Sequence, residues 1–216
     1  MRLLVVALLL LASLGCQRGA SDESPAPVPG GQSDEQLRSY LAADRDGWSH
    51  PQEVTRTLGL RDGQVVADVG AGSGYWTVHL ARAVAPSGKV LALDQDPYAI
   101  HFLRRRLADD PALRALPIEV RRVAGESAGL SRASVDLVFL CDVHVFLAED
   151  TWVAPWLAGL RDALKPGGRL VVIENRTKPE GVPVTRAQMI KAFQGGGFTL
   201  KAEHDVVKRC HFMEFQ

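Results

Sequence analysis

The chain has 216 residues, of which 46% are hydrophobic and 23% charged, and its 25 basic residues balance its 25 acidic ones. This length is enough for one domain with a substantial core, and the composition is that of a globular protein. The zero net charge excludes a protein drawn as a whole to nucleic acid by a basic field, so no nucleic-acid partner is expected. Three cysteines, Cys16, Cys141 and Cys210, are too few for a disulfide framework and fit no metal-ligand spacing, so no metal site is expected.

The first residues read as a signal for export. Arg2 gives one positive charge, and residues 3–14 are almost wholly apolar, about the length of a signal-peptide core and too short to span a bilayer. The following Ser13-Leu14-Gly15-Cys16 resembles a bacterial lipoprotein signal, in which the cysteine is lipidated, although Ser13 stands where an aliphatic residue is usual. The same stretch satisfies the rule for ordinary secretory cleavage. We expect a signal peptide over residues 1–15 and either a lipid anchor at Cys16, holding the protein to the membrane of the cell envelope, or a soluble periplasmic product.

A third interpretation, an artefactual start upstream of a cytosolic enzyme, is disfavoured because the next methionine is Met189. Residues 16–33 are rich in Ser, Pro, Gly, Asp and Glu, so they bury too little surface to offset the entropy of ordering and form a flexible linker. The domain is then expected over residues 34–216. It opens with helices near 34–43 and 51–58, and Trp48 between them either covers a ligand mouth or fastens these helices to the body.

A glycine-rich turn follows the first expected strand. Residues 65–69 are apolar and rich in Val, as in a buried parallel strand, and a helix is expected over 75–85. Between them, Gly70, Gly72 and Gly74 let the chain turn sharply and allow a ligand to approach the backbone. The N-terminus of the helix directs unpaired N–H groups at that ligand, which suits an anionic group such as a carboxylate.

The spacing of this turn separates two cofactor classes. The dinucleotide fingerprint is G-x-G-x-x-G, and Tyr75 stands where its third glycine would fall, which argues against NAD. With Asp68 in front, the stretch reads D-x-G-x-G-x-G and resembles the first motif of the class I S-adenosylmethionine (SAM)-dependent methyltransferases. The alternative is an ordinary glycine-rich strand-to-helix turn.

Two further strand ends carry acids. The expected strand 90–94 ends at Asp94, where a carboxylate accepts the two hydroxyls of a ribose, and Asp96 suits the N-cap of the helix over 97–108. A third strand over 118–124 leads to Glu126. The resemblance implies that the acid after this strand contacts the adenine amine; the alternative is a solvent-exposed loop acid.

The fourth expected strand, 135–142, ends in Asp142 and is followed by His144, so both lie where ligands bind in such sheets. The stretch resembles a subgroup related to the ubiquinone/menaquinone-type methyltransferases, but the order of its aromatic and histidine residues differs. We expect Asp142 to orient the acceptor or the methyl donor and His144 to accept a proton, a structural histidine being the alternative.

The rest of the chain completes the sheet. A helix over 151–164, a turn at 165–168, a strand to Glu174 and a helix over 185–194 precede two antiparallel strands near 198–207 and 211–215. The prediction is an α/β, Rossmann-like, doubly wound sheet of seven strands, mostly parallel with a C-terminal antiparallel hairpin, as the resemblance also implies. The candidate cofactor-binding residues are Asp68, Gly70, Ala71, Gly72, Gly74, Tyr75, Asp94, Gln95, Glu126, Ser127 and Asp142, and the catalytic candidates are Asp142 and His144.

The resemblance implies a SAM-dependent methyltransferase acting on an unidentified acceptor, for which we expect a small molecule. The second hypothesis is an exported lipoprotein that binds SAM or a nucleoside without turnover. A NAD-dependent dehydrogenase ranks last. The oligomeric state cannot be inferred from the sequence.

Overall fold

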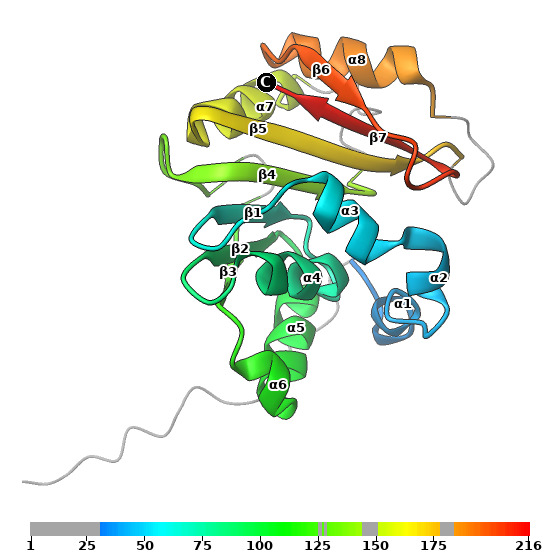
Figure 1. The fold of residues 1–216 in the computed structure, drawn as a ribbon, viewed down its shortest axis with the longest axis vertical. Coiled ribbons are helices and arrows are strands. Elements are labelled where there is room, and N and C mark those ends of the chain that lie inside the picture. The colour runs from blue at the N-terminus through cyan, green and yellow to red at the C-terminus, as the bar shows by residue number, and fades with distance from the viewer. Residues whose placement is uncertain (1–30, 125–126, 128, 144–150, 178–183) are drawn as a thin grey trace, which may run out of the picture.

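A computed structural model describes residues 31–124, 127, 129–143, 151–177 and 184–216. The expected signal peptide and nearly all of the linker lie outside these residues. The described part forms one seven-stranded sheet in the order β3-β2-β1-β4-β5-β7-β6, with helices on both faces (Figure 1). This is the predicted doubly wound α/β fold.

Five parallel strands make up most of the sheet: β1 (Val65–Val69), β2 (Lys89–Asp94), β3 (Ile118–Arg122), β4 (Val135–Cys141) and β5 (Leu164–Asn175). The central residues of β1, β2, β4 and β5 are buried on both faces, which explains the unbroken apolar runs in the sequence, whereas β3 at the edge of the sheet is only half-buried. At the C-terminus, β7 (Cys210–Phe215) pairs antiparallel with both β5 and β6 (Leu200–Glu203). The predicted C-terminal hairpin is therefore confirmed, with its second strand inserted next to β5.

Helices divide between the two faces of the sheet. The helices α3 (Pro51–Thr57) and α4 (Tyr75–Val84) pack on one face through a core that contains Leu80 and Phe139. On the same face, α5 (Pro97–Asp109) packs Leu103 against Ala92, and the short α6 (Pro111–Arg114) follows it. The opposite face is covered by α7 (Val153–Ala163) and α8 (Arg186–Gly195).

Two short helices, α1 (Asp34–Ser39) and α2 (Arg45–Ser49), precede the sheet and lie beyond the carboxyl ends of its strands (Figure 1). The sequence predicted a longer first helix and did not predict α2. None of the described helices is long and apolar enough to cross a membrane.

One predicted turn takes a different form. Residues 165–168 bulge within β5, because the pairing with β4 steps from Val135 opposite Leu164 to Leu137 opposite Arg169. Gly167 adopts a φ of 80° in this bulge, a conformation that glycine adopts without strain.

The order of the strands places a ligand site. From β1 the chain adds β2 and then β3 toward one edge of the sheet. It then returns to β4 on the other side of β1 and adds β5 toward the opposite edge. Ligands of open α/β sheets bind at the carboxyl ends of the strands on either side of such a switch. Here these ends are Val69, with the glycine-rich turn, and Cys141, with Asp142.

Candidate functional site

The glycine-rich turn forms the floor of the site. Gly70, Gly72 and Gly74 have φ values of 78°, 52° and 76°, the left-handed region that L side chains rarely adopt. The turn is held to β2, since the N–H groups of Gly70 and Ala71 both donate to the carbonyl of Leu93, at 2.8 and 3.0 Å. The backbone is thereby fixed before any ligand arrives.

Each glycine of the turn meets a different neighbour. A Cβ at Gly74 would collide with the side chain of Leu103, so this glycine lets α5 approach the start of α4. A Cβ at Gly70 would lie 2.9 Å from Cγ2 of Val143. At Gly72 the nearest atom would be Oε1 of Gln32, at 3.5 Å, so Gly72 is the point where the turn opens toward the site. The three predicted glycines therefore serve both packing and ligand approach.

Asp68 lies beneath the turn with only 2% of its surface exposed. Its Oδ2 accepts a hydrogen bond of 2.5 Å from the hydroxyl of Thr77, on the first turns of α4. Burial raises the pKa of Asp68 to about 7, against the opposing effect of the Thr77 bond, and the nearby charge of Asp94 raises it further. A cationic group bound above Asp68 would favour its ionised form.

Asp94 joins the turn to the end of β2. Its Oδ2 accepts from the N–H of Gly72 at 2.8 Å, its Oδ1 accepts from the N–H of Asp96 at 2.9 Å, and burial raises its pKa. The backbone of Gln95 also hydrogen-bonds to this carboxylate, and because a carboxylate has about four acceptor positions, capacity for one further hydroxyl donor remains. Asp96 caps α5 by accepting from the N–H of Tyr98, as predicted, and Gln95 is exposed beside Asp94.

A cavity of about 110 Å³ lies over the glycine turn. Its size suits the amino-acid portion of a SAM-like ligand rather than the whole molecule. The residues that line it come from the N-terminal segment, the turn, α4 and the end of β4: Gln32, Tyr40, Arg45, Asp68, Gly70, Ala71, Gly72, Ser73, Tyr75, Trp76, Cys141 and Asp142. Seven of the predicted site residues are thus brought together: Asp68, Gly70, Ala71, Gly72, Tyr75, Asp142 and, through its bond to Gly72, Asp94.

Two lining residues that the sequence did not single out carry polar atoms without a partner. Arg45 is only 8% exposed, and its Nε makes no hydrogen bond within the described residues. Oε1 of Gln32 is likewise buried and unpartnered in the described part of the chain. The backbone of Gln32 is held by its N–H, which donates to Oδ2 of Asp96 at 2.7 Å. Two residues that line the cavity therefore leave one donor and one acceptor without a partner among the described residues.

Aromatic rings hold Arg45 in place. Its guanidinium carbon lies 3.9 Å from the ring centroid of Tyr75 and 5.6 Å from that of Trp48, and its Nη1 donates to the carbonyl of Tyr40. The hydroxyl of Tyr75 is within 2.6 Å of both Ser49 and Asp46 of α2. Tyr75, predicted to bind the cofactor, lines the cavity and also ties α2 to the glycine turn.

Trp48 packs against arginines on both sides. Besides Arg45, the guanidinium carbon of Arg209 lies 3.3 Å from its ring centroid. Trp48 does not line the cavity. The contacts favour the interpretation that it fastens the N-terminal helices to the C-terminal part of the sheet.

Asp142 makes hydrogen bonds that hold two strand ends together at the edge of the cavity. It adopts a φ of 52°, and its Oδ1 accepts from the backbone N–H and the side-chain Nδ2 of Asn175, at 3.0 and 2.7 Å. These bonds join the ends of β4 and β5. Asp142 is therefore placed to position neighbouring groups, with one oxygen already engaged.

Four other predicted site residues are not among those that line the cavity. Glu126 and His144 lie outside the described residues. Ser127 is described and exposed, and its N–H donates to the carbonyl of Ala124 at 2.9 Å. Gly74 does not line the cavity but begins α4 as its N-cap.

Residues 67–170 match the model of a family described as a methyltransferase domain. Among curated relatives, the protein-L-isoaspartate O-methyltransferase of Methanothrix thermoacetophila is 28% identical over 142 residues, which are 65% of this chain and 61% of that protein. A ubiquinone/menaquinone biosynthesis C-methyltransferase of Legionella pneumophila is 34% identical over 119 residues, 55% of this chain and 45% of that one. The chain thus spans about half the length of these relatives.

Solved structures agree with the fold. A SAM-dependent methyltransferase from Aquifex aeolicus is 20% identical, with a TM-score of 0.74 over 85% of this chain and 98% of its own. A cyclase with 20% identity and a TM-score of 0.61, over 78% of this chain and 62% of its own, shares the fold as well, so the fold by itself does not determine the reaction. The orphan donor and acceptor over the glycine turn fit the methionine end of SAM. Residues 67–170, just under half of the chain, thus match a methyltransferase domain, and the fold is that of a solved SAM-dependent methyltransferase, which agrees with S-adenosylmethionine as the expected cofactor.

Proposed function

We propose that this protein transfers the methyl group of SAM to a small-molecule acceptor. The observation that carries the proposal is the pair of unpartnered groups over the glycine turn, Nε of Arg45 and Oε1 of Gln32. An α-amino acid needs a donor for its carboxylate and an acceptor for its ammonium. Leaving such groups buried without partners is costly, so their presence supports a ligand that completes them.

The remaining contacts follow from the geometry. The N–H groups of Gly70, Ala71, Gly72 and Gly74 already donate to protein oxygens, so the carboxylate is left to the N–H groups of the first turn of α4, with Arg45 beside them. Asp68, whose pKa burial raises to about 7, becomes a carboxylate when an ammonium lies above it. Asp94 has an acceptor position left for a ribose hydroxyl, and we assign Glu126 to the adenine on the resemblance alone.

When bound, SAM supplies a methyl group that its sulfonium has already activated for displacement. The chain then has to bind SAM and the acceptor, orient them and exclude water, and it needs no nucleophile of its own. We assign the orienting role to Asp142, because Asn175 fixes its carboxylate. We assign proton acceptance from the acceptor to His144, whose ordinary pKa lies near neutrality.

The acceptor class rests on the sequence. The balanced net charge gives no reason to expect nucleic acid, and one matched relative is named for quinone biosynthesis. Another is named for a protein substrate, so protein side chains serve as the comparison in any acceptor screen.

Calorimetric titration of the purified protein tests the proposal. SAM and S-adenosylhomocysteine are expected to bind saturably, and NAD is expected not to bind. Asp94→Ala should weaken SAM binding at least about tenfold, since charge-assisted hydrogen bonds contribute about 1.5–3 kcal/mol each. The matched control is Asp44→Ala, an exposed carboxylate whose side chain makes no capping bond.

Binding of SAM to a folded Asp94→Ala protein as tightly as to the wild type would contradict the ribose assignment. Absence of SAM and S-adenosylhomocysteine binding to folded wild-type protein would overturn the proposed function. Transfer of tritiated methyl from SAM to a panel of small hydroxylated aromatics, with a protein panel in parallel, then identifies the acceptor class.

A further inference from the structure

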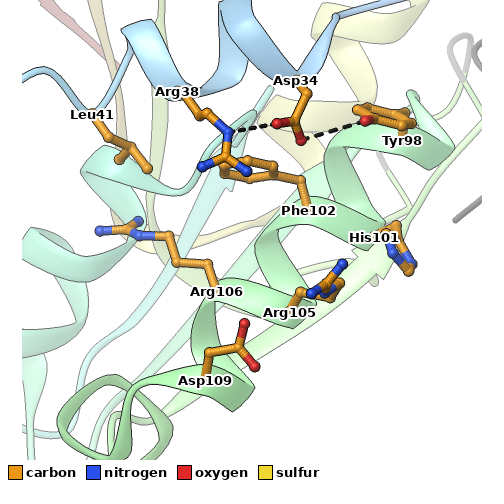
Figure 2. A pocket seen from close by; sticks show the side chains of 9 residues that line it. All are labelled: Asp34, Arg38, Leu41, Tyr98, His101, Phe102, Arg105, Arg106 and Asp109. Atoms are coloured by element: carbon orange, nitrogen blue, oxygen red, sulfur yellow. Dashed lines mark hydrogen bonds and ion pairs between the residues drawn. The ribbon is translucent and has the colours of Figure 1, made fainter. Parts of the chain in front are cut away.

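A second cavity lies outside the cofactor site, in the groove between α1 and the outer side of α5. It encloses about 550 Å³ and is lined by Asp34, Arg38, Leu41, Tyr98, His101, Phe102, Arg105, Arg106 and Asp109 (Figure 2). None of these residues lines the cavity over the glycine turn. We propose that this groove binds a small molecule that carries a phosphate group on an aromatic body.

The charges of the groove favour an anion. Asp34 is engaged by Arg38, and the hydroxyl of Tyr98 donates to its other oxygen at 3.4 Å. Arg105, in contrast, makes no hydrogen bond or ion pair within the described residues, although its charge acts on Asp34. Within the lining, Arg105 and Arg106 outnumber the one remaining carboxylate, the exposed Asp109, so the groove retains positive charge, although Asp110 next to it also acts on Arg106.

His101 adds a second unsatisfied group. Its Nε2 is buried and has no hydrogen-bond partner among the described residues, and Figure 2 shows its ring beside Arg105. Guanidinium groups pair with the oxygens of a phosphate in a fork geometry, and an imidazole N–H can donate to the same group. Arg105 and His101 together make a donor set for a phosphate, while Arg106 lies toward Leu41 in Figure 2 and donates to the glycine turn.

The apolar walls of the groove favour an aromatic body on the proposed ligand. Leu41, Tyr98 and Phe102 line it with apolar surface next to the cationic groups (Figure 2). A volume of this size falls within the range of about 300–1,000 Å³ that is typical of small-molecule sites, which combine apolar walls with a few placed polar groups. An aromatic ring attached to the phosphate would lie along these walls.

Arg106 connects the groove with the cofactor site. Its Nη1 donates to the carbonyls of Ser73 and Gly74, at 3.0 and 2.9 Å, on the back of the glycine turn. Burial lowers the pKa of Arg106, and an anion in the groove would offset that desolvation cost. The groove and the cavity over the glycine turn share no lining residue, so the proposal does not depend on the methyltransferase assignment.

Titration calorimetry of the purified protein with phenyl phosphate, at fixed ionic strength, tests the proposal. Saturable binding with one site is expected, at least about fivefold tighter than binding of inorganic phosphate because the ring buries apolar surface. Arg105→Gln should weaken phenyl phosphate binding at least about tenfold. Arg104→Gln, the same charge change one position away on α5 and outside the groove, should leave the affinity unchanged.

SAM titrations of the same proteins distinguish binding in the groove from binding over the glycine turn. Arg105→Gln should bind SAM like the wild type, which also shows that the variant is folded. The proposal is overturned if folded wild-type protein shows no saturable binding of phenyl phosphate, if Arg104→Gln weakens binding as much as Arg105→Gln, or if inorganic phosphate binds equally well. A protein that fails to bind SAM but binds phenyl phosphate would overturn the proposed function and leave this site standing.

Discussion

At the scale of single residues, the site contains a carboxyl group whose burial works against the stability of the fold. Asp68 is almost completely buried, and burial raises its pKa from 3.8 to about 7. Between these two values the carboxyl is protonated in the folded protein and ionised in the unfolded chain. The folded state therefore loses stability from Asp68 as the pH rises from about 4 to about 7, and no more is lost above that.

Replacing Asp68 by Asn removes this penalty, because the amide oxygen still accepts from Thr77 and cannot ionise. We expect Asp68→Asn to unfold like the wild type near pH 3.5, where the carboxyl is largely protonated in both states, and to be more stable by about 1–3 kcal/mol at pH 8, since each pKa unit of the shift corresponds to about 1.4 kcal/mol. Urea unfolding of both proteins at the two pH values measures the difference. A difference that stays constant or shrinks with rising pH would show that Asp68 has an ordinary pKa.

The same substitution should act on the cofactor in the opposite direction. SAM affinity of the wild type is expected to rise up to about pH 7 as Asp68 ionises, while that of Asp68→Asn stays low and independent of pH in this range. Residues of functional sites often lower the stability of the fold while they strengthen ligand binding. A substitution that makes the protein more stable and weakens SAM binding is therefore expected at such a site.

The spacing of the sequence was enough to predict that Asp68 and Asp94 lie near strand ends beside the glycine turn. Arg45 and Gln32 could not be predicted in this way. Gln32 reaches Asp96 across 64 positions of sequence, so its place in the site depends on the tertiary fold. Arg45 carried one weak signal, its position in a segment rich in aromatic and charged residues.

At the scale of elements, the short helix α2 brings Arg45 to the cavity over the glycine turn. Its five residues would not form a stable helix alone, and the hydroxyl of Tyr75, at the start of α4, holds it through Ser49 and Asp46. Such a helix has no periodic pattern, which is why the sequence predicted only a connecting segment. The long strands and helices were predicted because their apolar periodicity extends over many residues.

If α2 presents Arg45 to the carboxylate of SAM, Arg45→Gln should distinguish two ligands. SAM binding is expected to weaken about 10- to 100-fold, since hydrogen bonds to charged groups contribute about 1.5–3 kcal/mol. Decarboxylated SAM, which lacks the carboxylate, should bind the variant and the wild type within about threefold. Fluorescence or calorimetric titration gives both affinities.

Arg56→Gln on α3 is the matched control, because it removes an exposed arginine and should change neither affinity. Equal weakening of both ligands by Arg45→Gln would mean that Arg45 supports the shape of the cavity rather than binding the carboxylate.

At the scale of the whole molecule, the strand order follows from the sequence once the glycine turn is recognised, because a right-handed crossover through α4 places β2 beside β1. The position of β7 between β5 and β6 depends on tertiary contacts, and a hairpin pattern in the sequence does not reveal it. The size of the cofactor cavity also lies beyond the sequence, since it depends on how closely residue 32 approaches Gly72.

We further propose, from residues 1–16, that the protein is exported and anchored to the cell envelope by a lipid on Cys16. SAM is polar and charged and does not cross a bilayer freely, so export would make the supply of cofactor a separate requirement. Metabolic labelling with palmitate in a bacterial host, followed by membrane fractionation, tests the anchor. We expect label and membrane association for the wild type and for Cys210→Ser, and neither for Cys16→Ser. An unlabelled wild-type protein whose mature N-terminus is residue 16 would instead establish secretory cleavage without lipidation, and an uncleaved N-terminus would rule out export through this signal.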